Sequence, residues 1–194
     1  MPEPRLDGIP RFARRLGLAA LVATAAWWPL RAPWGEAFRT LAGALLAAAG
    51  WGRVTLHAAP AGSRWADDTL VSIAGQAEGV SFPIGSLRFS YIPLAVFLCL
   101  AFAAGQWRSP RKGFLVAGLA GVAAYGVASL AVTIARTTLL EPGLGFRPPA
   151  VVATLVELTY RTLVNPPAFE YVVPAFIWLA SSAASAASPA RSRG

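Results

Sequence analysis

Charged residues are scarce in this sequence. They make up 13% of its 194 residues, whereas 56% are hydrophobic; a typical soluble domain carries about 25% charged residues. The chain has a single cysteine, Cys99, which excludes an intramolecular disulfide framework. It also has a single histidine, His57, which cannot build a metal site without several other ligands. The shortage of charge indicates an integral membrane protein.

The charge that is present is mostly positive, with a net charge of +8 and a single lysine. A nucleic-acid surface would combine a basic stripe with interleaved aromatic residues, and the sequence has no such stripe. Its arginines stand beside apolar runs, where they set membrane topology and meet anionic headgroups. We therefore expect a lipid bilayer, and no nucleic acid, as the partner of these charges.

The longest apolar stretch lies between residues 89 and 136. Its second half, 113–136, carries no charge before Arg136, and a helix of roughly 20 apolar residues is enough to cross a bilayer core of about 30 Å. Its first half, 90–107, is shorter and is followed by a basic connection with Arg108, Arg111 and Lys112. Basic connections tend to face the cytoplasm, so the stretch predicts a transmembrane hairpin with a cytoplasmic turn.

Two further apolar runs, 16–34 and 168–187, complete the prediction of an α-helical integral membrane protein with four transmembrane helices. Pro29 and Pro33 are expected to break the first helix near the outer surface. Arginines precede the first run and follow the last, which predicts two cytoplasmic termini. The abundance of Ala, Gly, Pro and Arg is typical of a GC-rich bacterial genome, and the expected location is the inner membrane.

Glycines recur in the run 113–136 and predict close packing between helices. The glycines concerned are Gly113, Gly118, Gly121 and Gly126. Two interpretations remain open at this point. The glycines face other helices of the same chain, or they form an interface between subunits. The sequence leaves the oligomeric state open.

Two shorter segments predict amphipathic helices along the outer membrane surface. The apolar run within 36–50 is too short to span a bilayer, although a tightly packed additional span is the alternative. The segment 150–164 starts after two prolines and places Glu157 and Arg161 one helical turn apart. Between the two segments, residues 51–88 show short alternating runs separated by Gly and Pro, which predict an extracytoplasmic insert of three antiparallel strands. Such a small sheet needs support, so we expect it to pack on 36–50 or on a partner.

Few side chains suggest chemistry. Cys99 lies within an apolar run where a thiolate is unfavourable, and His57 is expected at the surface. We therefore expect no catalytic, cofactor-binding or metal-binding residues. Ionisable groups at membrane depth are functional candidates, and Arg136 and Glu170 either pair with each other or anchor the chain at the interface. The complete set of candidate functional polar residues is Arg39, Arg136, Glu157, Arg161 and Glu170.

Several features together resemble a known family. They are Trp27 and Trp28 in the first run, the outer strand region, the segment SYIPLAVFLCLAF and the final LTYRTLVNPPAFEYVVPAFIWLA. This layout is similar to that of small membrane proteins that accompany one subtype of exosortase, a bacterial transpeptidase of carboxy-terminal sorting systems. The resemblance implies a place beside such a system. Exosortases themselves use an outward-facing cysteine, arginine and histidine, which Cys99 and His57 do not match, so transpeptidase activity is not implied.

Two functions fit these patterns. The first is a non-enzymatic accessory or assembly protein of the bacterial inner membrane, which binds another membrane protein through 51–88 and 150–164. The second is a small membrane enzyme or transporter that uses Arg39, Arg136 and Glu170 around a polar cavity. The second requires the three charges to converge in one pocket. The first lets them point apart and requires an exposed apolar patch on the insert.

Overall fold

A computed structural model describes residues 8–60, 68–74, 79–106, 113–140, 148–166 and 168–187. Most of the charges that predict the orientation lie outside these residues, namely Arg5, Arg108, Arg111, Lys112, Arg191 and Arg193. Arg11, Arg14 and Arg15 lie within them. The elements are α1 (Gly8–Ala48), β1 (Val54–Ala58), β2 (Thr69–Ile73), β3 (Val80–Ile84), the π-helix η1 (Leu87–Tyr91), α2 (Ile92–Ala103), α3 (Gly113–Leu140), α4 (Ala150–Thr159), the π-helix η4 (Tyr160–Val164) and α5 (Phe169–Ala187).

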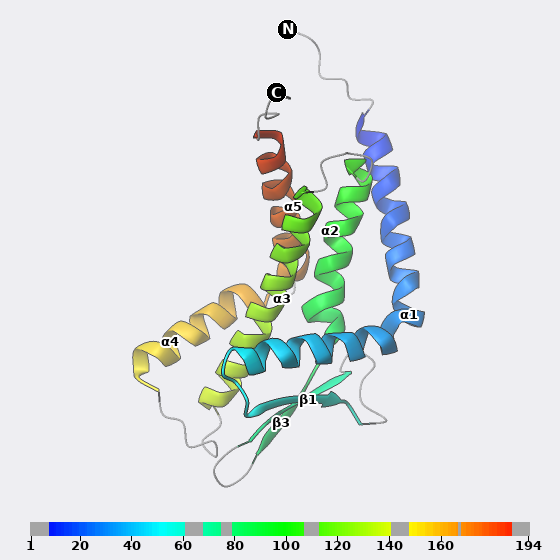
Figure 1. Ribbon diagram of the computed structural model, residues 1–194. Coiled ribbons are helices and arrows are strands. Elements are labelled where there is room, and N and C mark those ends of the chain that lie inside the picture. The colour runs from blue at the N-terminus through cyan, green and yellow to red at the C-terminus, as the bar shows by residue number, and fades with distance from the viewer. Residues whose placement is uncertain are drawn as a thin grey trace, which may run out of the picture.

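The helices form a bundle with the sheet at one end (Figure 1). The first half of α1 runs beside α2, and α3 and α5 complete the bundle. The beginning of α1 and the end of α5 both lie at the end of the bundle away from the sheet, while α4 projects sideways from the bundle (Figure 1). The architecture therefore separates an apolar helical bundle from a mixed helix-and-sheet end.

The prolines of α1 bend the helix and do not end it. Pro29 and Pro33 both lie inside a helix of 41 residues, so the expected break between 16–34 and 36–50 is wrong. A proline removes one backbone hydrogen bond and crowds the preceding turn, which kinks a helix that tertiary contacts keep intact. The second half of α1 consequently turns across the end of the bundle (Figure 1).

The prediction of three antiparallel strands is confirmed, with the spatial order β1-β2-β3. Val71 of β2 stands opposite Leu56 of β1 and Phe82 of β3, so one apolar face continues across the sheet. This face packs on the second half of α1, as expected for 36–50, and on α3. The buried core at this end consists of Ala42, Leu46, Val71, Ile73, Ile84, Phe89, Leu130, Ile134 and Val164.

The prediction of four transmembrane helices is wrong. Among the described residues, only Gly113–Leu139 forms a single helix that is long and apolar enough to cross a membrane. A second crossing would require Ala150–Val164 and Phe169–Ala184 to count as one span, although they meet at a bend of 80°. The physical reason is length and composition: η1 and α2 together form the apolar helix Leu87–Ala103, which rises only about 25 Å. The run 16–34 is interrupted by Arg31 and two prolines, and α5 ends in serines and alanines.

The glycines of α3 allow close packing within this chain. A Cβ on Gly118 would lie 2.1 Å from the Phe97 ring of α2, and a Cβ on Gly126 would lie 2.4 Å from the backbone oxygen of Phe89. Gly121 faces Ile177 of α5 in the same way, at 3.1 Å. The intrachain interpretation of these three glycines is therefore confirmed.

Candidate functional site

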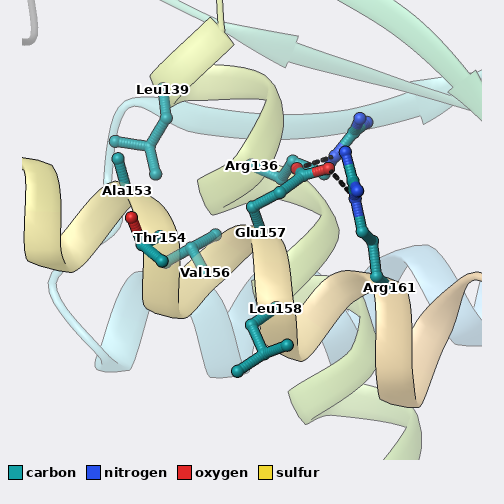
Figure 2. Close-up of a pocket in the computed structure, with 8 residues that line it drawn as sticks. All are labelled: Arg136, Leu139, Ala153, Thr154, Val156, Glu157, Leu158 and Arg161. Atoms are coloured by element: carbon teal, nitrogen blue, oxygen red, sulfur yellow. Dashed lines mark hydrogen bonds and ion pairs between the residues drawn. The ribbon is translucent and has the colours of Figure 1, made fainter.

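Two arginines share one carboxylate where α3 meets α4. Arg136 lies near the end of α3, and its Nε donates to Oε2 of Glu157 at 2.7 Å. Arg161, one turn after Glu157, donates its Nε to the other oxygen, Oε1, at 2.6 Å. Figure 2 shows the carboxylate between the two guanidinium groups. The predicted pair of Glu157 and Arg161 is confirmed, and Arg136 joins it to form a cluster of three.

The position of Arg136 is fixed by a further contact. Its guanidinium carbon lies 4.3 Å from the centre of the Tyr160 ring, in a cation–π arrangement. Tyr160 begins η4, directly after α4. The guanidinium is thus held by the ring on one side and by the Glu157 carboxylate on another. This arrangement orients Arg136 toward the surface of α4 and not toward α5.

The cluster borders an open pocket of about 660 Å³. Its lining comes from the end of α3 and from one side of α4 and η4, and most of it is apolar. The residues that line it are Arg136, Leu139, Ala153, Thr154, Val156, Glu157, Leu158 and Arg161. Figure 2 shows Leu139 and Ala153 together on one side of the pocket and the two arginines with Glu157 on another. The pocket therefore combines a charged corner with an apolar wall.

The charges of the cluster do not cancel. The two arginines and the single carboxylate leave a net charge of +1. The hydrogen bond from Arg136, followed by the one from Arg161, holds the pKa of Glu157 below its usual range, so the carboxylate is ionised at neutral pH. The Arg161 side chain is 71% exposed and that of Arg136 is 32% exposed. An anion from outside therefore has access to positively charged donors here.

Glu170 belongs to a different cluster. It forms an ion pair with Nε of Arg88 in η1, and the Arg88 Nη2 also donates to the backbone oxygen of Val164 at 2.5 Å. Of the two alternatives for Arg136 and Glu170, the pairing of one with the other is therefore wrong. The pair of Arg88 and Glu170 instead joins η1, η4 and the first turn of α5 where these three elements meet.

Arg39 belongs to a third cluster, at the start of β2. Its Nη1 donates to the backbone oxygen of Asp68 at 3.2 Å. The Asp68 carboxylate accepts hydrogen bonds from the backbone N–H of Ser86 at 2.8 Å and from the Ser86 hydroxyl at 2.5 Å. Thr69 also donates to it, at 3.1 Å. These contacts fasten the turn after β3 and the start of β2 to the second half of α1.

Cys99 and His57 lie where the sequence predicts, one buried and the other at the surface. Cys99 is a free thiol buried in α2, and His57 lies exposed on β1, where its Nε2 is 3.0 Å from the Thr55 hydroxyl. Within the part of the chain that the structure describes, no group of three His, Cys, Asp or Glu side chains is placed to hold a metal ion.

Sequence inspection did not identify three residues that the structure places at these clusters. Arg88 and Asp68 find their partners through the fold, at separations of 76 and 18 residues for Val164 and Ser86 respectively. No spacing rule covers such distances. Tyr160 was identifiable as a candidate, because it is an aromatic residue in an amphipathic segment and arginines commonly stack on aromatic rings. The arginine that it contacts is Arg136 and not its neighbour Arg161.

No protein-family model, no curated protein sequence and no solved structure matches the chain.

Proposed function

We propose that this protein is a non-enzymatic accessory protein of the bacterial inner membrane, which is held in the bilayer by α3 and binds another membrane protein through α4. The observation that carries the proposal is the exposure of α4. Its ten residues are predominantly apolar, and none of them is buried within the chain. An apolar helix left uncovered in this way is stable when lipid or a partner covers it.

The surface of α3 supports the membrane location. In its most apolar window of 18 residues, 28% of the residues are buried inside the protein. The core helix of a water-soluble protein would be largely covered, whereas α3 leaves Val116 and Leu119 exposed. The uncharged run that precedes Arg136 measures about 34 Å at 1.5 Å per residue, which is sufficient for the hydrocarbon core.

The exposed side of α4 supports a docking role. Val151 is 70% exposed, Leu155 57% and Leu158 56%. Their spacing of four and then three residues places them along one stripe of the helix. Among the described residues of 51–88, no large hydrophobic side chain is exposed to this extent. The exposed apolar patch that was expected on 51–88 is therefore not found in the described part of that insert, and the proposed partner surface is α4 instead.

The arrangement of the charges argues against the enzyme or transporter alternative. That alternative requires Arg39, Arg136 and Glu170 to converge. Each of them instead contacts different partners: Arg136 contacts Glu157, Glu170 contacts Arg88, and Arg39 contacts the backbone of Asp68. The pocket beside Arg136 is lined by neither Arg39 nor Glu170. We include an exosortase-type sorting protein as the first partner to test, because the layout of the sequence resembles proteins that accompany such enzymes.

Affinity purification from native membranes tests this proposal. The chain is tagged, native membranes are solubilised in mild detergent, and stoichiometric membrane proteins are identified. We expect one partner to co-purify with the wild-type chain and to be lost from the double variant Val151→Asn with Leu155→Gln. The matched control is Leu18→Gln with Val22→Asn, which alters an equally spaced and similarly exposed pair on α1.

The outcomes are distinct. Loss of the partner from the α4 variant alone supports docking through α4. Equal loss from both variants means that exposed apolar residues act only through membrane insertion, which contradicts the assignment to α4. A chain that fractionates with the soluble proteins, or a homogeneous particle with no partner, contradicts the proposed function.

A further inference from the structure

We infer that the pocket between α3 and α4 binds one anionic phospholipid, with its phosphate on Arg136 and Arg161 and an acyl chain along the apolar wall. This inference rests on the membrane location proposed above. It assigns a ligand to the cluster, which the docking proposal for the outer stripe of α4 does not require.

The numbers of positive and negative side chains at the pocket favour an anionic ligand. One carboxylate serves two guanidinium groups, and among the residues that the structure describes no other acidic side chain lines the pocket. The remaining positive charge is only partly hydrated, because the Arg136 side chain is about two-thirds covered. A phosphate diester with a single negative charge would neutralise it. Arginine binds phosphate well because its planar fork of N–H groups fits two phosphate oxygens.

The geometry of the arginine N–H donors also favours a bound anion. Both arginines use Nε to reach Glu157, one to each carboxylate oxygen. Within the described residues, no hydrogen bond is found for the terminal Nη groups of either arginine. Glu157 therefore orients both guanidinium groups while leaving their terminal N–H groups for a second acceptor. Tyr160 restricts Arg136 further, so the donors are arranged before a ligand arrives, which lowers the entropic cost of binding.

The depth of Arg136 in the proposed bilayer also favours a phospholipid. Arg136 is the first charge after the long apolar run of α3. With that run in the hydrocarbon core, Arg136 reaches the headgroup layer, where phosphates are concentrated. Leu139, Ala153, Val156 and Leu158 form the apolar part of the lining, and Leu139 and Ala153 lie together away from the arginines (Figure 2). A ligand with a phosphate and a hydrocarbon chain matches both parts of the pocket.

Lipid titration of the purified full chain tests the inference without any protein partner. The protein in detergent is titrated with phosphatidylglycerol or with phosphatidylcholine of the same acyl chains, and bound lipid is counted by native mass spectrometry. We expect a Kd at least tenfold lower for phosphatidylglycerol. Arg161→Gln is expected to raise that Kd about tenfold, since one charge-assisted contact is lost. Arg161 is exposed, so the variant should fold normally.

Two comparison variants make the test specific. Arg53→Gln removes an exposed arginine at the start of the sheet and is expected to leave the Kd unchanged. Glu157→Gln removes the negative charge that repels a phosphate but keeps one oxygen that can accept a hydrogen bond from an arginine Nε, so it is expected to lower the Kd for phosphatidylglycerol while also lowering the Tm. A variant that merely damaged the fold would bind the lipid more weakly and also be less stable. Tighter binding in a less stable variant therefore supports the site.

Three results would overturn the inference. The first is equal affinity for the two lipids, and the second is an unchanged Kd in Arg161→Gln. The third is a Kd for soluble glycerol phosphate as low as that for phosphatidylglycerol, which would show a phosphate site with no lipid component. Each of these can occur in a chain that is extracted from membranes with its partner. Failure of the lipid site is therefore distinguishable from failure of the proposed function.

Discussion

The contact between α3 and η1 makes a quantitative prediction for Gly126→Ala. The added Cβ would lie 2.4 Å from the backbone oxygen of Phe89, whereas ordinary contacts between such atoms are about 3.5 Å or longer. The oxygen belongs to the backbone and cannot rotate away. Helix α3 and η1 must therefore separate by about 1 Å, at a place where Phe89 and Leu130 belong to the buried core.

The magnitude follows from two opposing effects. Forcing an extra methyl group into a well-packed contact costs about 1–3 kcal/mol, and a clash with backbone belongs at the upper end of that range. Alanine in place of glycine favours the helix by about 1 kcal/mol. The expected result is a net loss of about 1–2 kcal/mol in the free energy of unfolding, which in a chain of this length corresponds to about 2–4 °C in Tm for each kcal/mol.

Intrinsic fluorescence of the seven tryptophans provides the assay, with thermal unfolding followed in one detergent. The matched control is Gly43→Ala in α1, where a Cβ would meet nothing within 4 Å. Only the helix-propensity gain applies to this control, so its Tm should equal or exceed that of the wild type. If Gly126→Ala proved as stable as Gly43→Ala, the close approach of α3 and η1 would be refuted.

Three further predictions concern the polar clusters. Asp68→Asn removes an acceptor of the Ser86 hydrogen bonds and should lower stability by about 1–2 kcal/mol, measured by denaturant unfolding; an unchanged midpoint would contradict that network. Arg88→Gln should destabilise more than Glu170→Gln, because Glu170 is 13% exposed and Arg88 39%, so an unpaired carboxylate is harder to solvate than an unpaired guanidinium; equal Tm losses would argue otherwise. Because the folded-state pKa of Glu157 is lowered, the stability that its cluster contributes is full above the ordinary carboxyl pKa of about 4.3 and is lost as the pH falls through the lowered pKa. Thermal unfolding at a series of acidic pH values should show this loss in the wild type and not in Glu157→Gln.

Local patterns in the sequence predicted the features that depend on neighbouring residues. The alternation around Val54, Val71 and Val80 predicted the strands, because side chains alternate between the two faces of a sheet. The spacing of Glu157 and Arg161 predicted their ion pair, because residues four apart are neighbours on a helix. The small residues of α3 predicted close helix packing. Each of these features is set by geometry that repeats within a few residues.

The membrane topology was not predictable in the same way. Apolar runs suggested four spans, but the folded chain distributes them differently. The run that starts at residue 16 continues through two prolines into a helix of 41 residues, and α2 has 12 residues. Hydropathy alone does not reveal where a helix begins, bends or ends once tertiary contacts stabilise a kinked or shortened form.

The sequence by itself determined the apolar run of α3, the three strands and the ion pair of Glu157 with Arg161, because composition and short-range periodicity are sufficient for them. Only the tertiary structure decided which charges meet. Arg136 lies 21 residues from Glu157, and Arg88 lies 76 residues from the Val164 carbonyl that it binds. Pairing over such separations follows from how the helices pack, and packing depends on the shapes of many side chains acting together. The candidate residues were therefore visible in the sequence, whereas their division into three separate clusters was a property of the fold.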